Sequence, residues 1–217
     1  MRTDEFFDFR GALTERLFLS ERYPWDALDN ICEYIRRIGR GLDKKCFTEV
    51  KNGVWVADSA AISESAELIA PLIIDAGAEV GNFSVVSSSV IGRDCVIGSF
   101  SDIRHSIFLD FSRAPAHNYV SNSIVGKRAR FGAGAIVSSI RADRGEVICE
   151  TDTERLNTGR VRFGALVGDG AEIGPSAVLS AGCVVERGAS VNPLTRARGF
   201  VSAGKTYRGE RITYDLL

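Results

Sequence analysis

The sequence has little of what several common protein classes require. No apolar run approaches the roughly 18 residues that a membrane-spanning helix needs. The opening residues 1–5 include acids and contain no apolar segment of a secretory signal. We therefore expect a cytoplasmic protein with no membrane partner. The formal net charge is -1, and so small a charge creates no strong field that would recruit nucleic acid.

Candidate ligands for a metal or a disulfide framework are also scarce. The chain has two histidines and five cysteines, and no pair of cysteines has CxxC spacing. Two histidines are too few for a zinc site built from three of them, and we predict no metal. The odd number of cysteines indicates reduced thiols that act as small apolar side chains in the cytoplasm.

The clearest feature that is present is a repeat of six residues. Aliphatic residues recur at this interval, with one five-residue step before Ile91, and a small residue often follows. A period of six fits a short strand and a sharp corner, and three such units close one coil of about 18 residues. The positions in phase are Val56, Ile62, Leu68, Ile74, Val80, Val86, Ile91, Ile97, Ile103, Val125, Phe131, Val137, Val167, Ile173, Leu179, Val185 and Val191.

This repeat predicts an all-β fold, a single-stranded left-handed parallel β-helix of hexapeptide repeats over residues 51–195. Residues 1–50 do not repeat, and we predict an α-helical N-terminal extension that caps the first coil or packs on a neighbouring subunit. The segments 108–122 and 141–162 interrupt the repeat, so we predict loops inserted at corners. The C-terminal tail, 196–217, is predicted to leave the coil and lie along its side.

Three strings of residues point to a family: 118–126 (NYVSNSIVG), 131–136 (FGAGAI) and 159–169 (GRVRFGALVGD). They resemble the hexapeptide-repeat acetyltransferase domain of bifunctional sugar-1-phosphate nucleotidyltransferase/acetyltransferases. The chain looks most like stand-alone versions described as UDP-N-acetylglucosamine pyrophosphorylase-like, from about Tyr23 to Gly199. No glycine-rich phosphate loop with a following basic residue is present, so we expect no nucleotidyltransferase activity.

The resemblance implies a homotrimer with each active site between two subunits. It also implies transfer of an acetyl group from acetyl-CoA, the co-substrate, to the amine of an amino-sugar phosphate. Because an ammonium group is not a nucleophile, a base with a pKa of about 7 must stand beside it, and the resemblance gives this role to His117. The same basis gives substrate contacts to Arg104, Tyr119, Ser139, Arg160 and Arg162, and acyl-CoA contacts to Ala133, Gly134 and Arg198.

The sequence departs from the family pattern at a central position. The family has a histidine, two residues and then the tyrosine, whereas here Ala116 occupies the histidine position and His117 follows it. His117 is thus either the general base or a histidine at a subunit interface. The charged run 141–162 is interpreted as a solvated loop because it carries both signs of charge.

Three functions remain open at this point. The first is a CoA-dependent N-acyltransferase for an amino-sugar phosphate, with His117 as its base. The second is a catalytically degenerate trimer that binds a sugar phosphate or nucleotide and partners or regulates a nucleotidyltransferase. The third is a structural trimer without a small-molecule site. The intact corner at Ala133, together with Tyr119 and Arg104, favours the first two.

Overall fold

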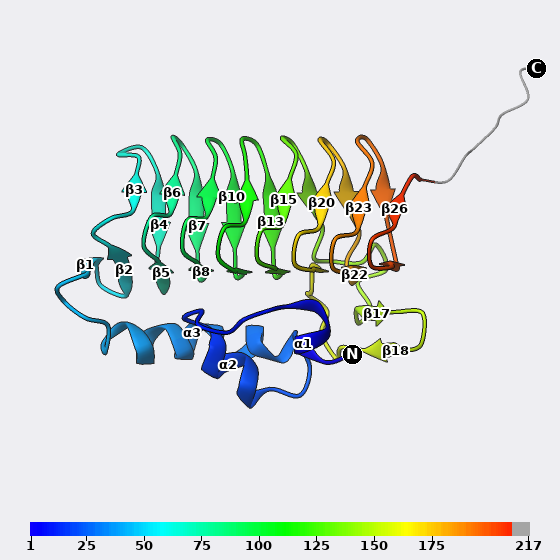
Figure 1. Cartoon of the computed structure of the whole chain (residues 1–217), viewed down its shortest axis with the longest axis horizontal. Helices are drawn as coiled ribbons and strands as arrows, with labels where there is room; N and C mark the ends of the chain where they lie inside the picture. Colours follow the sequence, from blue (N-terminus) through cyan, green and yellow to red (C-terminus); the bar gives the residue numbers. More distant parts are fainter. Residues whose placement is uncertain (210–217) are drawn as a thin grey trace, which may run out of the picture.

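The computed structural model describes residues 1–209 and consists of stacked triangular coils (Figure 1). Each full coil gives one strand to each of three parallel sheets, which we name A, B and C, and this confirms the expected parallel β-helix. Sheet A contains β2 (Val54–Ala57), β5 (Leu72–Ile74), β8 (Val90–Ile91), β11 (Ile107–Phe108), β14 (Ile124–Val125), β19 (Ala165–Val167), β22 (Cys183–Val185) and β25 (Phe200–Val201), with β1 (Phe47–Lys51) antiparallel to β2.

The other two sheets complete the triangle. Sheet B contains β3 (Ala61–Ile62), β6 (Glu79–Val80), β9 (Val96–Ile97), β12 (Arg113–Ala114), β15 (Arg130–Phe131), β20 (Glu172–Ile173), β23 (Ser190–Val191) and β26 (Thr206–Tyr207). Sheet C contains β4 (Glu67–Ile69), β7 (Val85–Ser87), β10 (Asp102–Arg104), β13 (Tyr119–Ser121), β16 (Ile136–Val137), β21 (Val178–Leu179) and β24 (Arg196–Ala197).

One residue of each short strand points into the coil and stacks on its counterpart in the next coil. In sheet C this inward column is Leu68, Val86, Ile103, Val120, Val137, Leu179 and Ala197, none of them more than 8% exposed. Removing such a side chain from water contributes about 1.5–3 kcal/mol. Between strands the chain turns a corner through a left-handed residue, as at Gly134 with φ 73°, where glycine has no Cβ to clash.

The prediction of an inserted loop at 108–122 is wrong. Here the chain runs through β11, β12 and β13 without leaving the coils, and Ala114 lies in register with Ile97. Ala114 takes the inward position that an aliphatic residue holds elsewhere. Because the large Phe131 follows in the same column of the next coil, the small side chain compensates for its volume.

The expected C-terminal tail is also wrong over its described part. From Arg196 to Tyr207 the chain forms β24, β25 and β26, which continue the three sheets. The inward residues Ala197 and Val201 are buried, at 0% and 4% exposure. The rest of the predicted tail, 210–217, lies outside the described residues.

The N-terminal helices lie along sheet A rather than over the first coil, so the expected cap is wrong (Figure 1). They are α1 (Thr3–Phe6), α2 (Glu15–Ser20) and α3 (Asp26–Gly39). Sheet A is apolar on both faces, because its outward residues also join a core with the helices; these are Trp55, Ile73, Val90, Ile107, Ile124, Leu166 and Val184. None of the helices within residues 1–209 is long and apolar enough to cross a membrane.

Between β16 and β19 the chain leaves the coils and returns without disturbing their register, since β14 pairs directly with β19. This excursion contains an antiparallel hairpin, β17 (Ile148–Glu150) and β18 (Arg155–Asn157). Cys149 of the hairpin is fully buried in the core that sheet A shares with the helices. The excursion is therefore anchored on the helical side of the coils.

Candidate functional site

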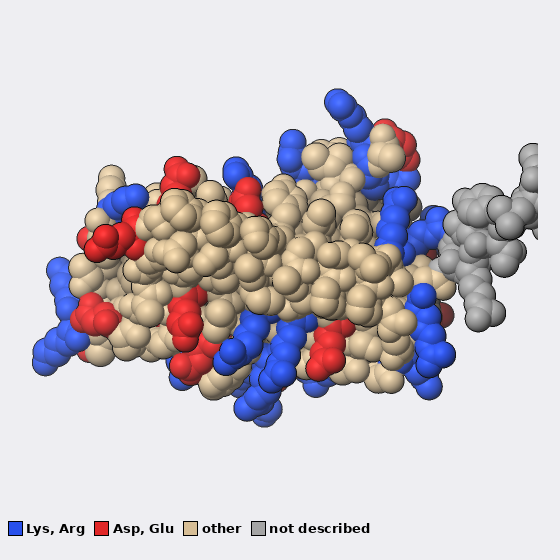
Figure 2. Space-filling model, turned by 90° about the horizontal axis from the view of Figure 1, so that it is seen from above, with Lys and Arg blue, Asp and Glu red and all other residues tan. Residues whose placement is uncertain are grey.

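The corner between sheets B and C carries His117, the predicted base. The first corner segment, 63–66, contains Glu64, but the later ones, 81–84, 98–101, 115–118, 132–135, 174–177 and 192–195, contain no Lys, Arg, Asp or Glu. Figure 2 looks down on the side opposite the helices and shows this uncharged ridge between two charged flanks. Along the ridge the ring of His117 stacks on Phe100, with centroids 5.1 Å apart and planes 5° from parallel, and Phe100 stacks on Phe83 at 5.3 Å.

His117 is exposed and adopts a left-handed backbone with φ 63°. Its ring makes no hydrogen bond within residues 1–209, so stacking on Phe100 alone sets its orientation. Ala133 and Gly134 take the equivalent corner positions one coil later, and the amide of Gly134 donates to the carbonyl of Ala116 at 3.2 Å. The predicted base and the predicted acyl-contacting residues therefore lie in neighbouring coils of one corner.

Tyr119 and Arg104 lie beside this corner, on the outer face of sheet C. Asp102 pairs in register with Tyr119, and Arg104 with Ser121. The guanidinium of Arg104 donates two hydrogen bonds to Asp102, Nε at 2.7 Å and Nη2 at 2.8 Å, and this partner raises the pKa of Arg104. A substrate anion would therefore share Arg104 with a carboxylate.

Two other predicted residues lie apart from His117. Ser139 is buried and its hydroxyl accepts a hydrogen bond from Ser121 at 2.8 Å. Arg160 lies on the helical side, where it donates to Asp26 at 3.0 Å and to Asp29 at 3.0 Å. These contacts hold the excursion against the start of α3.

An arginine groove lies over the last coils of sheet C, beneath the start of the excursion. A hollow of about 690 Å³ is lined by Ser138, Arg141, Val178, Ser180, Arg196 and Arg198, among others. A second hollow of about 410 Å³ shares Arg141 and adds Arg144 and Arg162. Asp143 is the acidic residue that lines the first hollow, and its carboxylate accepts two hydrogen bonds from the guanidinium of Arg141. Of these arginines, Arg162 and Arg198 were predicted as site residues. Arg141 and Arg144 were not, because they lie in the run of mixed charge, and Arg196 was not, because it was placed in a tail predicted to leave the coil.

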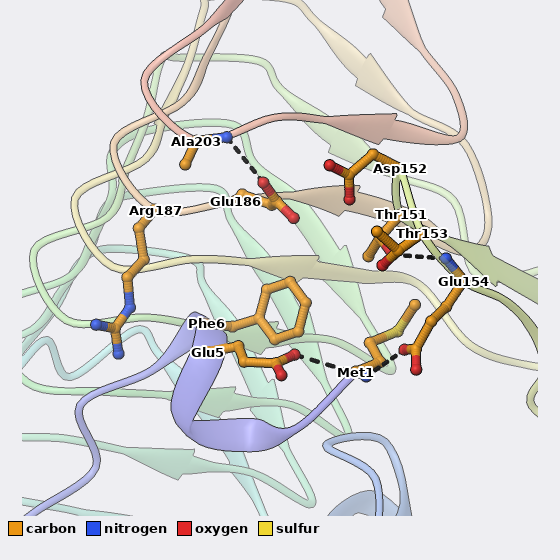
Figure 3. Close-up of a pocket in the computed structure, with 10 residues that line it drawn as sticks. All are labelled: Met1, Glu5, Phe6, Thr151, Asp152, Thr153, Glu154, Glu186, Arg187 and Ala203. Atoms are coloured by element: carbon orange, nitrogen blue, oxygen red, sulfur yellow. Dashed lines mark hydrogen bonds and ion pairs between the residues drawn. The ribbon is translucent and has the colours of Figure 1, made fainter.

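A smaller cavity of about 340 Å³ lies where the N-terminus meets the hairpin and the last coils (Figure 3). The amino group of Met1 pairs with Glu154 and, at 3.5 Å, with Glu5. Glu186 accepts a hydrogen bond from the amide of Ala203 at 2.8 Å. Glu154 thus joins the N-terminus to the hairpin, and Glu186 joins the last two coils. Across the described residues, no three His, Cys, Asp or Glu side chains are grouped so that they could hold a metal.

Comparison with known proteins extends this picture. Residues 68–152 match the family model described as GMPPB C-terminal domain. The chain is 29% identical over 103 residues to a bifunctional sugar-1-phosphate nucleotidylyltransferase/acetyltransferase of Sulfurisphaera tokodaii, covering 42% of this chain and 26% of the relative. It is 25% identical over 183 residues to the bifunctional protein GlmU of Methanococcus vannielii, covering 76% of this chain and 43% of the relative. The chain thus spans less than half the length of these relatives.

A hexapeptide transferase family protein from Anaplasma phagocytophilum is similar in structure, with a TM-score of 0.39 and 15% identity, over 75% of this chain and 82% of that one. The coils and the curated relatives together define the class, a hexapeptide-repeat β-helix domain. They support the resemblance seen in the sequence, to the acetyltransferase domain of GlmU-type proteins.

Proposed function

We propose that this chain is a CoA-dependent N-acyltransferase that acetylates an amino-sugar phosphate and works as a homotrimer. The names of the curated relatives support the acetyltransferase chemistry. The observation that carries the proposal is the uncharged corner, where an exposed imidazole and the Ala133–Gly134 backbone occupy neighbouring coils. Tyr119 and Arg104 on the adjoining face supply the contacts that an acceptor sugar and its phosphate need.

The proposed reaction needs one base and one oxyanion donor. His117 removes a proton from the acceptor ammonium, and the free amine attacks the thioester carbonyl of acetyl-CoA. The carbon–sulfur bond breaks, the attacking nitrogen gives up its second proton to become an amide, and the CoA thiolate takes up that proton as it leaves. The amide of Ala133 donates no hydrogen bond within residues 1–209, so it is available to a developing oxyanion.

The arginine groove supports the CoA part of the proposal. Arg141, Arg144, Arg162, Arg196 and Arg198 surround it with a strong excess of positive charge. Guanidinium groups bind phosphates through paired, charge-assisted hydrogen bonds. In this proposal they hold the diphosphate and the 3′-phosphate of CoA, while the pantetheine arm follows sheet C toward the corner.

A second candidate is a trimer that binds a sugar phosphate or nucleotide without turnover and partners a nucleotidyltransferase. One observation favours it: no acceptor within the described chain orients the His117 ring, whereas a general base ordinarily has such a partner. An imidazole fixed only by stacking can also serve as a binding surface.

The test is calorimetric titration with acetyl-CoA, with and without glucosamine-1-phosphate, while free thiol is measured in the same samples. For the acyltransferase we expect thiol release that depends on the sugar and falls by about 100-fold or more in His117→Ala. His105→Gln is the matched control and should keep the activity. Binding without thiol release would favour the second candidate, and no binding of CoA would refute the first.

A further inference from the structure

Three rings form a stacked column along the uncharged ridge, and His117 is the last of them. Phe83, Phe100 and His117 are 17 positions apart, which is the spacing at which neighbouring coils pair in register here. All three have a left-handed backbone, with φ of 55°, 59° and 63°. Because the backbones match, the side chains leave the corner in the same direction and their rings stack, with planes 23° and 5° from parallel.

The two phenylalanines occupy a costly position. They are 62% and 54% exposed, so they bury little apolar surface within the described chain. A left-handed backbone is also uncommon for a residue with a bulky side chain, whereas Gly134 holds the same corner position one coil further on without a Cβ. The ring of Phe100 contacts Phe83 on one side and His117 on the other. What the pair contributes to this chain is therefore the stack on His117.

The stack supplies what His117 lacks. A general base must present a ring nitrogen to the acceptor amine in a fixed plane, and a hydrogen bond to the other nitrogen ordinarily fixes that plane. His117 has no such bond within residues 1–209. The ring of Phe100, 5.1 Å away, fixes the plane from one face and leaves both nitrogens free at the edge. The opposite face looks toward the next coil, where Gly134 has no side chain and leaves room for the acetyl group.

We propose that Phe100, supported by Phe83, is the positioning residue for His117. It touches neither the sugar nor CoA and acts through the imidazole, whose plane it holds while the ammonium gives up its proton. This inference rests on the proposed function, because it takes the general base from it. It goes beyond that function by giving the exposed rings a role in the rate of the reaction rather than in the binding of either substrate.

Leucine in place of Phe100 removes the ring but keeps an apolar side chain. The chain itself carries Leu194 at the equivalent corner position with φ 59°, so this backbone accepts leucine. We expect kcat for thiol release to fall by about 5–10-fold in Phe100→Leu, because a loosely held base is aligned for less of the time, while the KM for both substrates is unchanged. Phe100→Tyr keeps a ring and should restore the wild-type kcat.

The matched control is Phe111→Leu. It removes another exposed phenylalanine with a left-handed backbone, φ 63°, from the corner between sheets A and B, and it should keep the wild-type kcat. Phe83→Leu, which removes the ring one step further from His117, should lower kcat by less than Phe100→Leu does.

Proton NMR tests the stack without turnover. The chain has two histidines, so two Hε1 signals are expected, and His105→Gln assigns them. An aromatic face shifts the protons that lie over it upfield. The His117 signal should therefore lie upfield of free histidine in the wild type and lose this shift in Phe100→Leu, while the His105 signal stays in place. Light scattering on the same samples should show an unchanged mass.

An unchanged His117 signal or an unchanged kcat in Phe100→Leu overturns the proposal. So does a fall in kcat that Phe100→Tyr does not restore, or a smaller assembly mass in Phe100→Leu, because the ring would then serve subunit contact. A wild type that releases no thiol refutes the general base and with it the kinetic role. Loss of the upfield shift in Phe100→Leu would still show in that case that Phe100 orients His117, so the two failures are distinguishable.

Discussion

Replacing Arg160 with glutamine should lower stability and leave substrate affinity unchanged. The resemblance placed Arg160 at the substrate, whereas in the structure its guanidinium is 17% exposed and bonds Asp26 and Asp29 at the start of α3. It also donates to the carbonyl of Thr158 at 2.7 Å. Burial lowers the pKa of Arg160, but the hydrogen bonds to Asp29 and Asp26 outweigh it and the pKa is raised.

The size of the effect follows from how far each partner is buried. Hydrogen bonds to charged groups contribute about 1.5–3 kcal/mol. Asp29 is 61% exposed, so its share is screened by water and we discount it. Asp26 also accepts from the amide of Tyr23 at 3.1 Å and keeps one partner in the variant. We therefore expect a loss of about 2 kcal/mol, or about 4–8 °C in Tm for a chain of this size.

Arg162→Gln is the matched control, two residues away in the arginine groove. It should unfold within about 0.5 kcal/mol of the wild type but should weaken the binding of CoA. Urea denaturation and calorimetric titration of CoA are run on both variants. The reasoning is refuted if Arg160→Gln is as stable as the wild type, or if it loses ligand affinity while keeping stability.

Two further predictions follow from buried groups. Burial lowers the pKa of His105 below 6.5, and its hydrogen bond to the Leu28 backbone raises it by a smaller amount. The unfolded chain therefore binds more protons, and the free energy of unfolding should fall as the pH drops below about 6.5. In urea titrations, the free energy of unfolding of His105→Gln should depend less on pH than that of the wild type. Ile107→Ala removes a fully buried side chain between sheet A and the helices, and should cost about 2–5 kcal/mol. Leu19→Ala, at a side chain that is 69% exposed, should cost no more than about 0.5 kcal/mol by the same assay.

The coils could be predicted from the sequence because each depends on a local rule. An inward aliphatic residue and a small corner residue repeat every six positions, and a coil is closed by its own short stretch of chain. The prediction failed where volume was shared between coils. At Ala114 and Ala197 the inward position holds an alanine. A search for large aliphatic residues every six positions misses such a position, and the repeat was therefore predicted to stop there.

The position of the helices was present in the sequence but was not used. Every third strand, such as Ile107–Phe108 or Ile124–Val125, is apolar at both of its positions, and a strand of this kind must be covered on both faces. Many strands of the other two sheets alternate, as Arg130–Phe131 does, although a few, such as Val96–Ile97 and Val178–Leu179, are apolar at both positions. Only in sheet A are all the described coil strands from β2 to β25 apolar, and this distinguishes the side of the coils that the helices cover.

The candidate site was predicted only in part. His117, Tyr119, Ala133 and Gly134 lie together because they are close in sequence or one coil apart. The arginine groove depends on how an excursion folds back over later coils, and the bond from Arg160 to Asp26 joins residues 134 positions apart. No local rule fixes contacts over such a separation.

The longest helix is similar in length to the part of the coil stack that lies between its two anchors, and this affects how the protein can change. Trp25, just before α3, packs on Phe163 at 6.0 Å, and Gly39 at its other end lies against Trp55 of the first coil. The helix spans about 21 Å at 1.5 Å per residue, and the coils it crosses rise by about 4.8 Å each. Repeat proteins ordinarily gain or lose units freely. Here a coil duplicated or deleted between these anchors would move one anchor of α3 without moving the other, so the helix restricts changes in the number of coils from β2 to β19.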